Sequence, residues 1–567
     1  MKRLIILAAT LIAGLSACDS LLDKEPLDRV TQFDYFKTRS DLELFSNPFY
    51  DNLLDKTPYD EQNDLLVQMT LSDVLYGGDK RTVPNTGGGW SWGNLRRINT
   101  LLEYVDQCED KKAVTEYTAL AKFFRAAFYF DKVKRFGDVP WYEVQLGSAD
   151  EALYKPRDSR ELIMTNMIKD IDEAINSGGL TEDISTYRVN KWAALALKAR
   201  FCLFEGTYRK YHGINLEGHD YTYYLEEAAK AAKTIIDEGP YKLYSTKNPD
   251  KDYMMLFAQE NASTEEYILA IRNSYEAQVY HNATAYTLLP TQGRPGYTRK
   301  FINMYLMKDG KAFTDKFKTE WQTMPFTEEV KDRDPRLAQS IRTPGYKRIG
   351  AKRVQGPDLG VTITGYQPIK FVQDTTASGG QIDRNDRSTC DMPVFRYAEV
   401  LLNYAEAKAE LGEMDQTVWN KTIRPLRERS GVSGAMPATA DPYLASYYDG
   451  VTDKWILECR RERSIELYME NTRRDDLMRW RMGHKLTVEF AGIHIPELGK
   501  PFDMNGDGKN DLCFYSKSHP KSGSNQTGVS YVEVTAEEGD NVTTYSVNKD
   551  NCLVYILDRS EERRVGK

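Results

Sequence analysis

Apolar residues recur at three- and four-residue spacing in several long stretches of this chain. In the stretch 113–136 the apolar positions form one wide stripe, and Gly137 and Pro140 follow where that stripe ends. This spacing is typical of an amphipathic α-helix, and a glycine followed by a proline is typical of its C-terminus. The same pattern predicts helices over 158–176, 190–208, 225–238, 397–411 and 462–480.

Alanines are concentrated where two of these predicted helices follow each other, at 193–199 and 228–232. Small residues allow paired helices to approach closely, as they do in tetratricopeptide-type repeats, although no fixed period is visible. Between residues 244 and 396 the pattern changes to Gly, Pro, Asn and Tyr with short strand-like pieces, and only 297–307 has a helical pattern. We therefore predict a mainly α fold of tetratricopeptide-like helical repeats packed against a loop-rich, irregular region with short strands.

The N-terminus has the pattern of a secreted lipoprotein. Lys2 and Arg3 precede an apolar run over 4–14, which is shorter than the roughly 20 residues of a membrane-spanning helix. Leu-Ser-Ala-Cys at 15–18 is the order that a lipoprotein signal peptidase reads. We expect residues 1–17 to be a signal peptide, Cys18 to carry the lipid and residues 18–30 to form a tether. An ordinary secretory signal with a chance cysteine is the alternative.

Composition narrows the class of protein. The 567 residues are 41% hydrophobic and 28% charged, with a net charge of −8, as expected of a folded globular protein. An acidic chain without a basic stripe argues against nucleic acid as a partner. The six cysteines after Cys18 include no CxxC pair, and the six histidines include no HExxH motif, which argues against catalytic zinc.

Five short motifs occur in a characteristic order along the chain. In chain order they are the segment from Trp92 to Asn99, the helix 123–130 with Phe-Gly-Asp-Val-Pro at 136–140, Arg-Asp-Pro-Arg-Leu at 333–337, the helix 396–407 and the charged helix 462–480. Together the motifs resemble the SusD/RagB family of outer-membrane nutrient-binding lipoproteins of the Bacteroidetes, over essentially the whole chain. Asn471 stands where the family has glycine, a small change because Asn also tolerates left-handed backbone.

The resemblance implies an architecture, a location and a partner. Residues 31–243 correspond to an N-terminal SusD-like helical region and 244–557 to a C-terminal SusD/RagB region with ligand loops. Residues 558–567 read as a translated sequencing adapter, and the family's C-terminal strand is missing after Leu557. The family's members are lipid-anchored on the outer membrane, face outwards and serve a TonB-dependent (SusC-like) transporter. Their ligands are chiefly glycans, with peptides in some members.

Two segments have residues suited to glycan binding, because sugar faces stack on aromatic rings and sugar hydroxyls bond to Asp, Asn or Arg. The candidates in the first segment are Tyr76, Asp79, Arg81, Trp90 and Trp92. Those in the second segment are Tyr280, Asn282, Tyr286, Tyr297 and Arg299. The alternative for several of these aromatic residues, and above all for Trp92, is a place in the core. Residues 89–93 match G-x-S-x-G, but a loop precedes them where a hydrolase has a strand.

A run of oxygen-bearing residues near the C-terminus suggests a structural calcium site. Its candidate positions alternate along the chain: Asp503, Asn505, Asp507, Lys509 and Asp511. Glycine at the sharp turn also fits a calcium loop, but Phe514 occupies the position of the EF-hand glutamate. An ion-free Asx turn is the alternative, and no other cofactor is expected.

Glu462, Glu466 and Glu470 recur every four residues among arginines, which suggests an ion-pair network rather than an acid/base site. No carboxylate pair stands out as catalytic, so we expect a binding protein and not an enzyme. The expected function is capture of oligosaccharides and their delivery to the transporter. A peptide-capture lipoprotein of the same family and a surface glycoside hydrolase are the alternatives.

Overall fold

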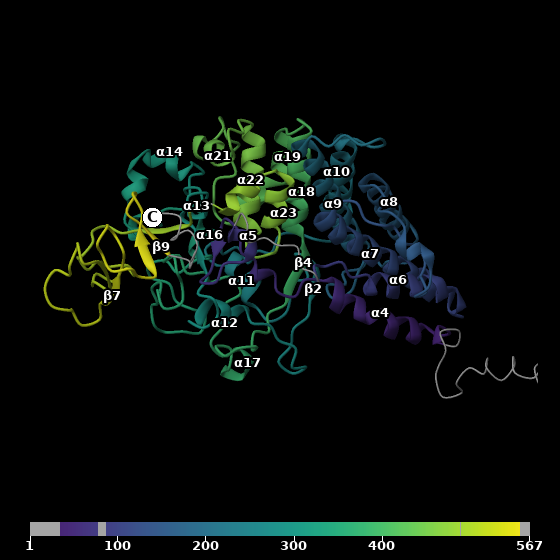
Figure 1. Cartoon of the computed structure of the whole chain (residues 1–567), viewed down its shortest axis with the longest axis horizontal. Coiled ribbons are helices and arrows are strands. Elements are labelled where there is room, and N and C mark those ends of the chain that lie inside the picture. Colours follow the sequence, from purple (N-terminus) through teal and green to yellow (C-terminus); the bar gives the residue numbers. More distant parts are fainter. Residues whose placement is uncertain (1–34, 77–86, 488, 556–567) are drawn as a thin grey trace, which may run out of the picture. The chain divides into compact units, whose positions relative to one another are not determined.

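The computed structural model describes residues 35–76, 87–487 and 489–555, and its mainly helical fold confirms the predicted class (Figure 1). The chain forms two compact units. Unit 1 comprises Met1–Leu53, Ser91–Ser159 and Lys169–Leu180, and unit 2 comprises Leu54–Trp90, Arg160–Ile168 and Thr181–Lys567. The predicted signal peptide, Cys18, the tether and the tail 558–567 lie outside the described residues.

Unit 1 is built around the long helix α7 (Lys111–Phe136), against which α4 (Arg39–Leu53) and α6 (Gly93–Tyr104) pack. The Asp110 side chain caps α7 by accepting hydrogen bonds from the backbone N–H groups of Lys112 and Ala113, and the helix ends at Gly137 with a φ of 70°. The predicted helix 113–136 is therefore confirmed. Unit 1 also contains two short 3₁₀ turns, η3 (Val105–Gln107) and η4 (Glu151–Tyr154).

Unit 2 contains the helices with small-residue contacts. Helix α9 (Lys191–His212) packs against α10 (Tyr221–Glu238), α10 against α18 (Tyr397–Glu410), and α18 against α22 (Lys454–Glu466). A β-carbon added at Gly206 of α9 would lie 2.8 Å from Leu225 of α10, so this contact needs glycine. Successive packed helices of this kind are the predicted tetratricopeptide-like repeats. Helix α8 (Arg160–Asn176) divides its residues between the two units.

The remaining elements are short. The helices are α5 (Asp73–Tyr76), α11 (Asp252–Ala258), α12 (Ala283–Leu288), α13 (Arg299–Ile302), α14 (Phe313–Phe317), α15 (Phe326–Glu329), α16 (Pro335–Ala338), α17 (Ala377–Gly380), α19 (Gln416–Lys421), α20 (Ile423–Arg429), α21 (Pro442–Tyr447) and α23 (Arg473–Arg479), with 3₁₀ turns η1 (Pro58–Asp60), η5 (Glu320–Thr323) and η6 (Gly483–Thr487). The strands are β1 (Leu66–Val67), β2 (Tyr267–Ile271), β3 (Gly296–Tyr297), β4 (Met392–Arg396), β5 (Ala491–His494), β6 (Leu512–Tyr515), β7 (Ser530–Glu533), β8 (Tyr545–Val547) and β9 (Cys552–Tyr555).

The strands form small, separate sheets. Antiparallel pairs join β1 to β3 and β2 to β4, a three-stranded sheet has the order β5-β9-β8, and β6 pairs with β7 in parallel. The β1–β3 pair sets Leu66 opposite Tyr297, and Asp64 just before β1 forms a buried ion pair with Arg473 at 2.7 Å. These contacts explain why residues 54–76 belong to unit 2, although the sequence suggests a single N-terminal region over 31–243.

Two predicted helices differ from the structure. The stretch 462–480 is not one helix, because α22 ends at Glu466 and α23 begins at Arg473. The Glu466 carbonyl instead accepts hydrogen bonds from Tyr253 and Arg396, and Met469 and Asn471 both have a φ of 54°. Asn471 thus adopts the left-handed backbone expected where the family has glycine.

The stretch 297–307 contains only the four-residue helix α13. Arg333 donates to the carbonyl oxygens of Ile302 (2.7 Å) and Tyr305 (2.8 Å), which takes the acceptors that a longer helix would use.

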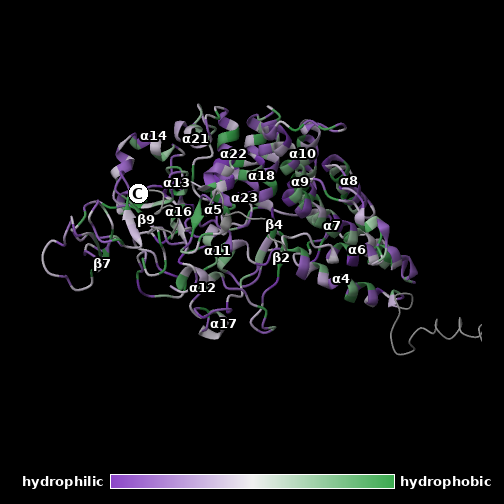
Figure 2. Cartoon of the chain, in the orientation of Figure 1, coloured by the Kyte–Doolittle hydropathy of each residue, from purple (hydrophilic) through white to green (hydrophobic). Residues whose placement is uncertain are grey.

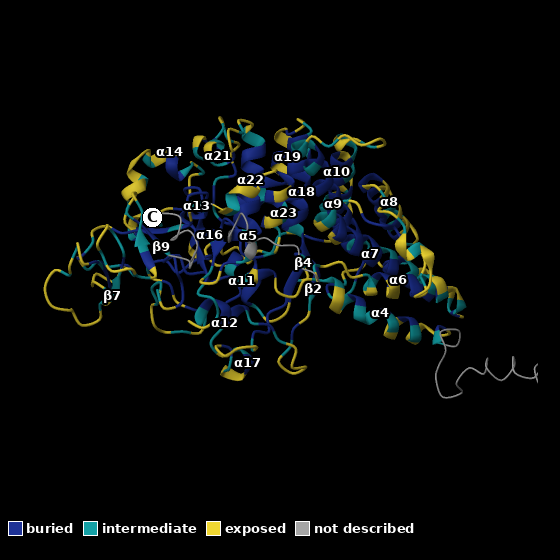
Figure 3. Cartoon of the chain, in the orientation of Figure 1, coloured by how far each residue is buried: buried dark blue, intermediate teal, exposed yellow. Residues whose placement is uncertain are grey.

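The interior of unit 2 combines apolar and charged groups. Figure 2 shows that much of α22 is hydrophilic, while Figure 3 shows the same helix largely buried. The six cysteines in the described part of the chain are buried, and none of them forms a disulfide with another described cysteine. Among the described helices, none is both long enough and apolar enough to cross a membrane.

Candidate functional site

The glutamates of the charged stretch lie in a buried ion-pair network. Glu466 is fully buried and contacts three arginines: Arg429 at 2.6 Å, Arg396 at 2.8 Å and Arg336 at 3.0 Å. Burial alone would raise the pKa of the Glu466 carboxyl, but the three arginines outweigh it and hold the pKa well below its usual range. A buried carboxylate that stays ionised and is fully paired suits a structural role rather than general acid/base catalysis.

The same network extends beyond the end of α22. Glu470 accepts from Arg396 at 2.7 Å and from Lys370 at 2.6 Å. Lys370 is itself buried, and burial lowers its pKa to about 8 despite the neighbouring Glu470. Glu462 pairs with Arg427 at 2.6 Å. The predicted ion-pair network therefore exists, but it connects several loops and helices instead of one helix face.

An exposed turn at 274–280 holds two tyrosines close together. Ser274 and Val279 form an isolated antiparallel bridge, and Gln278 has a φ of 56°. The rings of Tyr275 and Tyr280 lie 6.3 Å apart between centroids, and the Tyr280 hydroxyl donates to the Tyr275 carbonyl at 3.2 Å. The Tyr275 side chain is 39% exposed, so the turn presents an aromatic surface to solvent.

A second loop packs against this turn through amide side chains. Asn282 donates to Gln292 at 2.7 Å and accepts from the backbone N–H of Asp386 at 2.9 Å, and Gln292 donates to Asn385 at 3.1 Å. The Arg387 guanidinium lies 5.0 Å from the centroid of the Tyr280 ring. We define the loop surface as Tyr275, Tyr280, Asn282, Gln292, Asn385 and Arg387.

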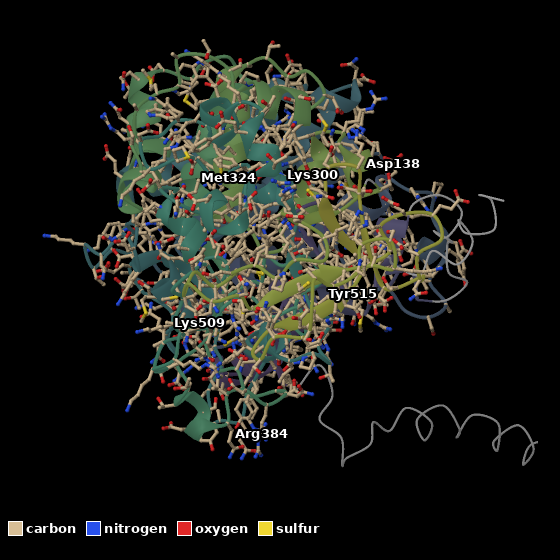
Figure 4. All side chains as sticks on the ribbon, turned by 90° about the vertical axis from the view of Figure 1, so that its left-hand side faces the viewer. Asp138, Lys300, Met324, Arg384, Lys509 and Tyr515 are labelled. Carbon is tan, nitrogen blue, oxygen red and sulfur yellow. The ribbon has the colours of Figure 1, made fainter. Side chains whose placement is uncertain are left out.

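His281, a buried residue beside the loop surface, connects the segment that follows the turn 274–280 to the segment 388–390. Its backbone N–H donates to the Ser388 carbonyl at 3.1 Å, and its ring Nε2 lies 2.7 Å from the Cys390 carbonyl oxygen. Burial lowers the pKa of His281 to about 4, so the ring is neutral near pH 7. The loop surface therefore rests on a fixed base. Within unit 2, Figure 1 shows the neighbouring turn α17 at the lower edge of the unit, and Figure 4 labels Arg384, next to Asn385, at the same lower edge.

Three predicted ligand residues are core residues instead. Tyr286 is 4% exposed, Arg299 is 5% exposed and Tyr297 is fully buried. The Tyr286 hydroxyl donates to Gln68 at 2.9 Å, and the Tyr297 hydroxyl contacts the Met469 sulfur at 3.0 Å. Arg299 donates to the Trp321 carbonyl at 2.8 Å. Their prediction as ligand residues does not fit this burial, because packing against the helices takes up their surfaces.

The first predicted segment is described only in part. Trp90 is 41% exposed, as a binding platform requires. Trp92, in unit 1, is half-buried, and its ring centroid lies 5.7 Å from those of both Phe128 and Tyr142, which supports the alternative of a core position. Asp79 and Arg81 lie outside the described residues, and Tyr76 is described only as the last backbone position of α5.

The sequence did not single out Asn385 and Arg387 of the loop surface. They lie in a polar run, Gln-Ile-Asp-Arg-Asn-Asp-Arg at 381–387, which differs little from an ordinary solvated loop. Their proximity to Asn282 depends on contacts across roughly a hundred residues of chain, so local spacing gives no signal of it.

The proposed calcium loop has the hydrogen bonds of an Asx turn. The Asp503 carboxylate accepts from the backbone N–H groups of Gly506 (2.6 Å) and Gly508 (2.8 Å), and Asp511 accepts from those of Met504 and Asn505. Asn505 and Asp507 accept from the N–H groups of residues 507 and 509. In the described ranges, no three His, Cys, Asp or Glu side chains are grouped to hold a metal ion. The geometry favours the ion-free alternative.

Comparisons with known proteins agree with this architecture. A model described as the SusD family matches residues 256–557, more than half of the chain, and one described as starch-binding associating with outer membrane matches residues 35–195. The SusD-like protein P38 of Formosa agariphila is 24% identical over 82% of this chain and 88% of its own length.

Solved structures share the fold. A SusD-like protein from Bacteroides fragilis superposes with a TM-score of 0.63 at 21% identity, covering 83% of this chain and 91% of its own. A SusD-like carbohydrate binding protein from the same species has a TM-score of 0.62 at 23% identity, covering 82% and 90%. A further relative, solved with xylogluco-oligosaccharide, has a TM-score of 0.54 at 18% identity, covering 78% and 84%. On the match of the family model to residues 256–557, this chain belongs to the SusD family.

Proposed function

We propose that this protein is a cell-surface lipoprotein that captures oligosaccharides and delivers them to a partner TonB-dependent outer-membrane transporter. The observation that carries the proposal is the loop surface, where two tyrosine rings lie beside an amide network and an arginine. Sugars present apolar faces to aromatic rings and hydroxyl groups to amides and guanidinium groups, so this combination suits a glycan. Relatives described as carbohydrate-binding or solved with an oligosaccharide support the same ligand class.

The proposed role is binding without catalysis. The carboxylates most prominent in the sequence, Glu462, Glu466 and Glu470, are buried and paired with arginine or lysine. Glycoside hydrolysis needs two carboxyl groups that face the substrate in a cleft. Lipidation of Cys18 supplies the proposed anchor, and an outward-facing position would place the loop surface where extracellular glycans can reach it.

The experiment is a binding comparison on the purified protein. Wild type is titrated calorimetrically against a panel of neutral and acidic glycans and against a peptide panel, and then compared with a Tyr280→Ala variant. We expect wild type to bind a glycan. Tyr280→Ala should bind the same glycan more weakly by about 1–2 kcal/mol, roughly 5- to 30-fold, because the variant loses an aromatic face. Affinity for peptides alone, or depolymerisation of a glycan by the protein, would contradict the proposal.

Tyr154→Ala is the matched control. Tyr154 is 85% exposed on η4 and lies outside the loop surface, so removing its ring tests the loss of an exposed tyrosine as such. We expect this variant to keep the glycan affinity of wild type. An equal loss in both variants would remove the loop surface from the proposed site.

A further inference from the structure

The stretch 342–387, which contains Asn385 and Arg387 of the loop surface, has the opposite charge to the rest of the protein. The whole chain has a net charge of −8, whereas residues 342–387 contain eight lysines and arginines and four aspartates, a net charge of +4. Lys370 is buried and pairs with Glu470, but the stretch remains positive without it. A local reversal of charge on an acidic protein creates a positive potential that attracts anions.

The exposed cations of this stretch lack carboxylate partners. Lys347, Lys352, Arg353 and Arg384 are exposed, and none of them forms an ion pair with any residue that the structure describes. Elsewhere on the protein many surface lysines are paired, for example Lys331 with Glu328 and Lys500 with Glu497. We define the basic rim as Lys347, Lys352, Arg353, Arg384 and Arg387.

Hydrogen bonds connect the loop 345–355 to the loop surface. Arg348 donates to the Asp383 carboxylate at 2.5 Å and to the Gln373 carbonyl at 2.9 Å, and the Thr375 N–H donates to the Ile349 carbonyl at 3.2 Å. Asp383 is three residues before Asp386, whose N–H bonds to Asn282, so their Cα atoms are at most about 11 Å apart. The basic rim and the turn 274–280, which carries Tyr275 and Tyr280 and is called the aromatic turn below, are therefore neighbouring parts of unit 2.

Two buried arginines lie beneath the loop 345–355. Arg342 and Arg348 are 8% and 5% exposed, and Arg342 lies 5.8 Å from the Tyr346 ring. Arg342 Nε and Arg348 Nη2 have no hydrogen-bond partner among the described residues. Three carboxylates lie near them: Asp383 bonds to Arg348, Asp374 accepts from Thr376 beside the loop, and Asp358 accepts from the Gly360 N–H. In the nearby turn 503–511, the carboxylates of Asp503 and Asp511 accept hydrogen bonds from backbone N–H groups of the same turn and do not pair with these arginines. Positive charge therefore remains in excess around the loop 345–355.

We infer that the captured ligand is an acidic oligosaccharide, whose sugar rings lie on Tyr275 and Tyr280 while its carboxylate or sulfate groups pair with the basic rim. This inference rests on the proposed function and names the substrate class of the same site. Arginine forms two parallel charge-assisted hydrogen bonds with either anion, and lysine adds a point charge. A neutral glycan would leave five cations of the rim without a counter-charge.

The test compares polymers that differ only in their acid groups. Wild type is titrated against dextran and dextran sulfate, and against polygalacturonic acid and its methyl ester, at low and at high salt. We expect the charged form of at least one pair to bind at least about 10-fold more tightly than the neutral form, with an advantage that shrinks at high salt. The pair that shows the difference tells sulfate from carboxylate.

Charge-reversal variants locate the binding. Lys352→Glu/Arg353→Glu should weaken binding of the acidic polymer at least about 10-fold while leaving any neutral glycan unaffected, because both side chains are exposed and outside the aromatic turn. The control, Lys308→Glu/Lys549→Glu, changes the net charge equally at two other exposed, unpaired lysines of unit 2 and should change the affinity less than about 2-fold.

Each outcome separates the two proposals. Equal affinity for charged and neutral polymers, or an equal loss in the rim variant and the control, overturns the inference but leaves glycan capture standing. Binding of peptides with no binding of any glycan overturns the proposed function as well.

Discussion

Two regions of unit 2 are rich in charged residues, but they differ in whether those residues are buried and paired. Around α22 and α23 most of the ionic groups are buried, and Glu462, Glu466 and Glu470 each contact an arginine or lysine within about 3 Å. In the loop 345–355 three cations, Lys347, Lys352 and Arg353, are exposed and form no ion pair with a described residue, whereas Arg348 is buried and pairs with Asp383. Charges paired in the interior fix the packing of loops and helices, whereas unpaired charges on a loop remain available to a ligand.

The density of charged residues along the sequence therefore does not show which segment can bind a ligand. The stretch 462–480 is rich in ionic residues, yet the side chains of Glu462, Glu466 and Glu470 are buried and paired with arginine or lysine. The residues of the loop surface are spread over two separate stretches, 275–292 and 385–387, and only hydrogen bonds between those stretches bring them together.

The largest effect is expected from breaking the buried network. Glu466→Ala would leave Arg336, Arg396 and Arg429 without their shared carboxylate, and removal of one partner from a buried ion pair costs about 3–5 kcal/mol of the free energy of unfolding. Chemical denaturation measures this loss.

The exposed pair of Glu328 and Lys331 provides the matched control. Glu328→Ala should change the free energy of unfolding by less than about 0.5 kcal/mol, because exposed pairs contribute little. Similar losses in the two variants would show that the buried network has no special structural role.

An intermediate effect is expected from Glu61, a buried carboxylate whose Oε2 has no hydrogen-bond partner among the described residues. Burial raises its pKa from 4.5 to about 8, although the Arg474 N–H opposes the rise. The folded protein then holds an extra proton between these pH values, so this group stabilises it below pH 4.5 and the contribution is lost as the pH rises through 8.

Glu61→Gln isolates that contribution, because glutamine keeps the neutral shape of the protonated acid. Relative to wild type, we expect the variant to be more stable at pH 8 than at pH 5 by on the order of 2 kcal/mol, measured by denaturation at both pH values. A difference between the two proteins that does not depend on pH would mean that Glu61 is ionised in the folded state.

The smallest effect is expected from calcium. The carboxylates of the turn 503–511 already accept backbone hydrogen bonds, so about 1 mM calcium, a concentration that fills weak extracellular sites, should shift the melting temperature by less than about 1 °C. Thermal unfolding with calcium and with a chelator checks this. A rise of several degrees that disappears in Asp503→Asn would instead establish a metal site there.

The sequence predicted the long helices well, because their apolar stripes are local signals. α7, α9 and α10 lie within a few residues of their predicted bounds, and Gly137 ends α7 as expected. The prediction was wrong at 467–472, where Tyr253 and Arg396 compete for the Glu466 carbonyl from far along the chain. No local pattern reveals such competition.

The candidate site was predicted less well than the fold. Composition marked the segment that contains Tyr280 and Asn282, but it could not separate these residues from Tyr297, because an exposed and a buried tyrosine look alike in sequence. Asn385 and Arg387 were missed for the complementary reason, since a polar loop gives no sign of what it packs against.

By itself, the sequence of this protein determined its family and its mainly helical class, because both depend on local order along the chain, and the lipoprotein signal at Cys18 stays a prediction from the same kind of pattern. Only the tertiary structure decided which charges are paired and which aromatic rings reach solvent. Burial and ion pairing depend on contacts between distant segments, and such contacts exist only after the loops have packed against the helices.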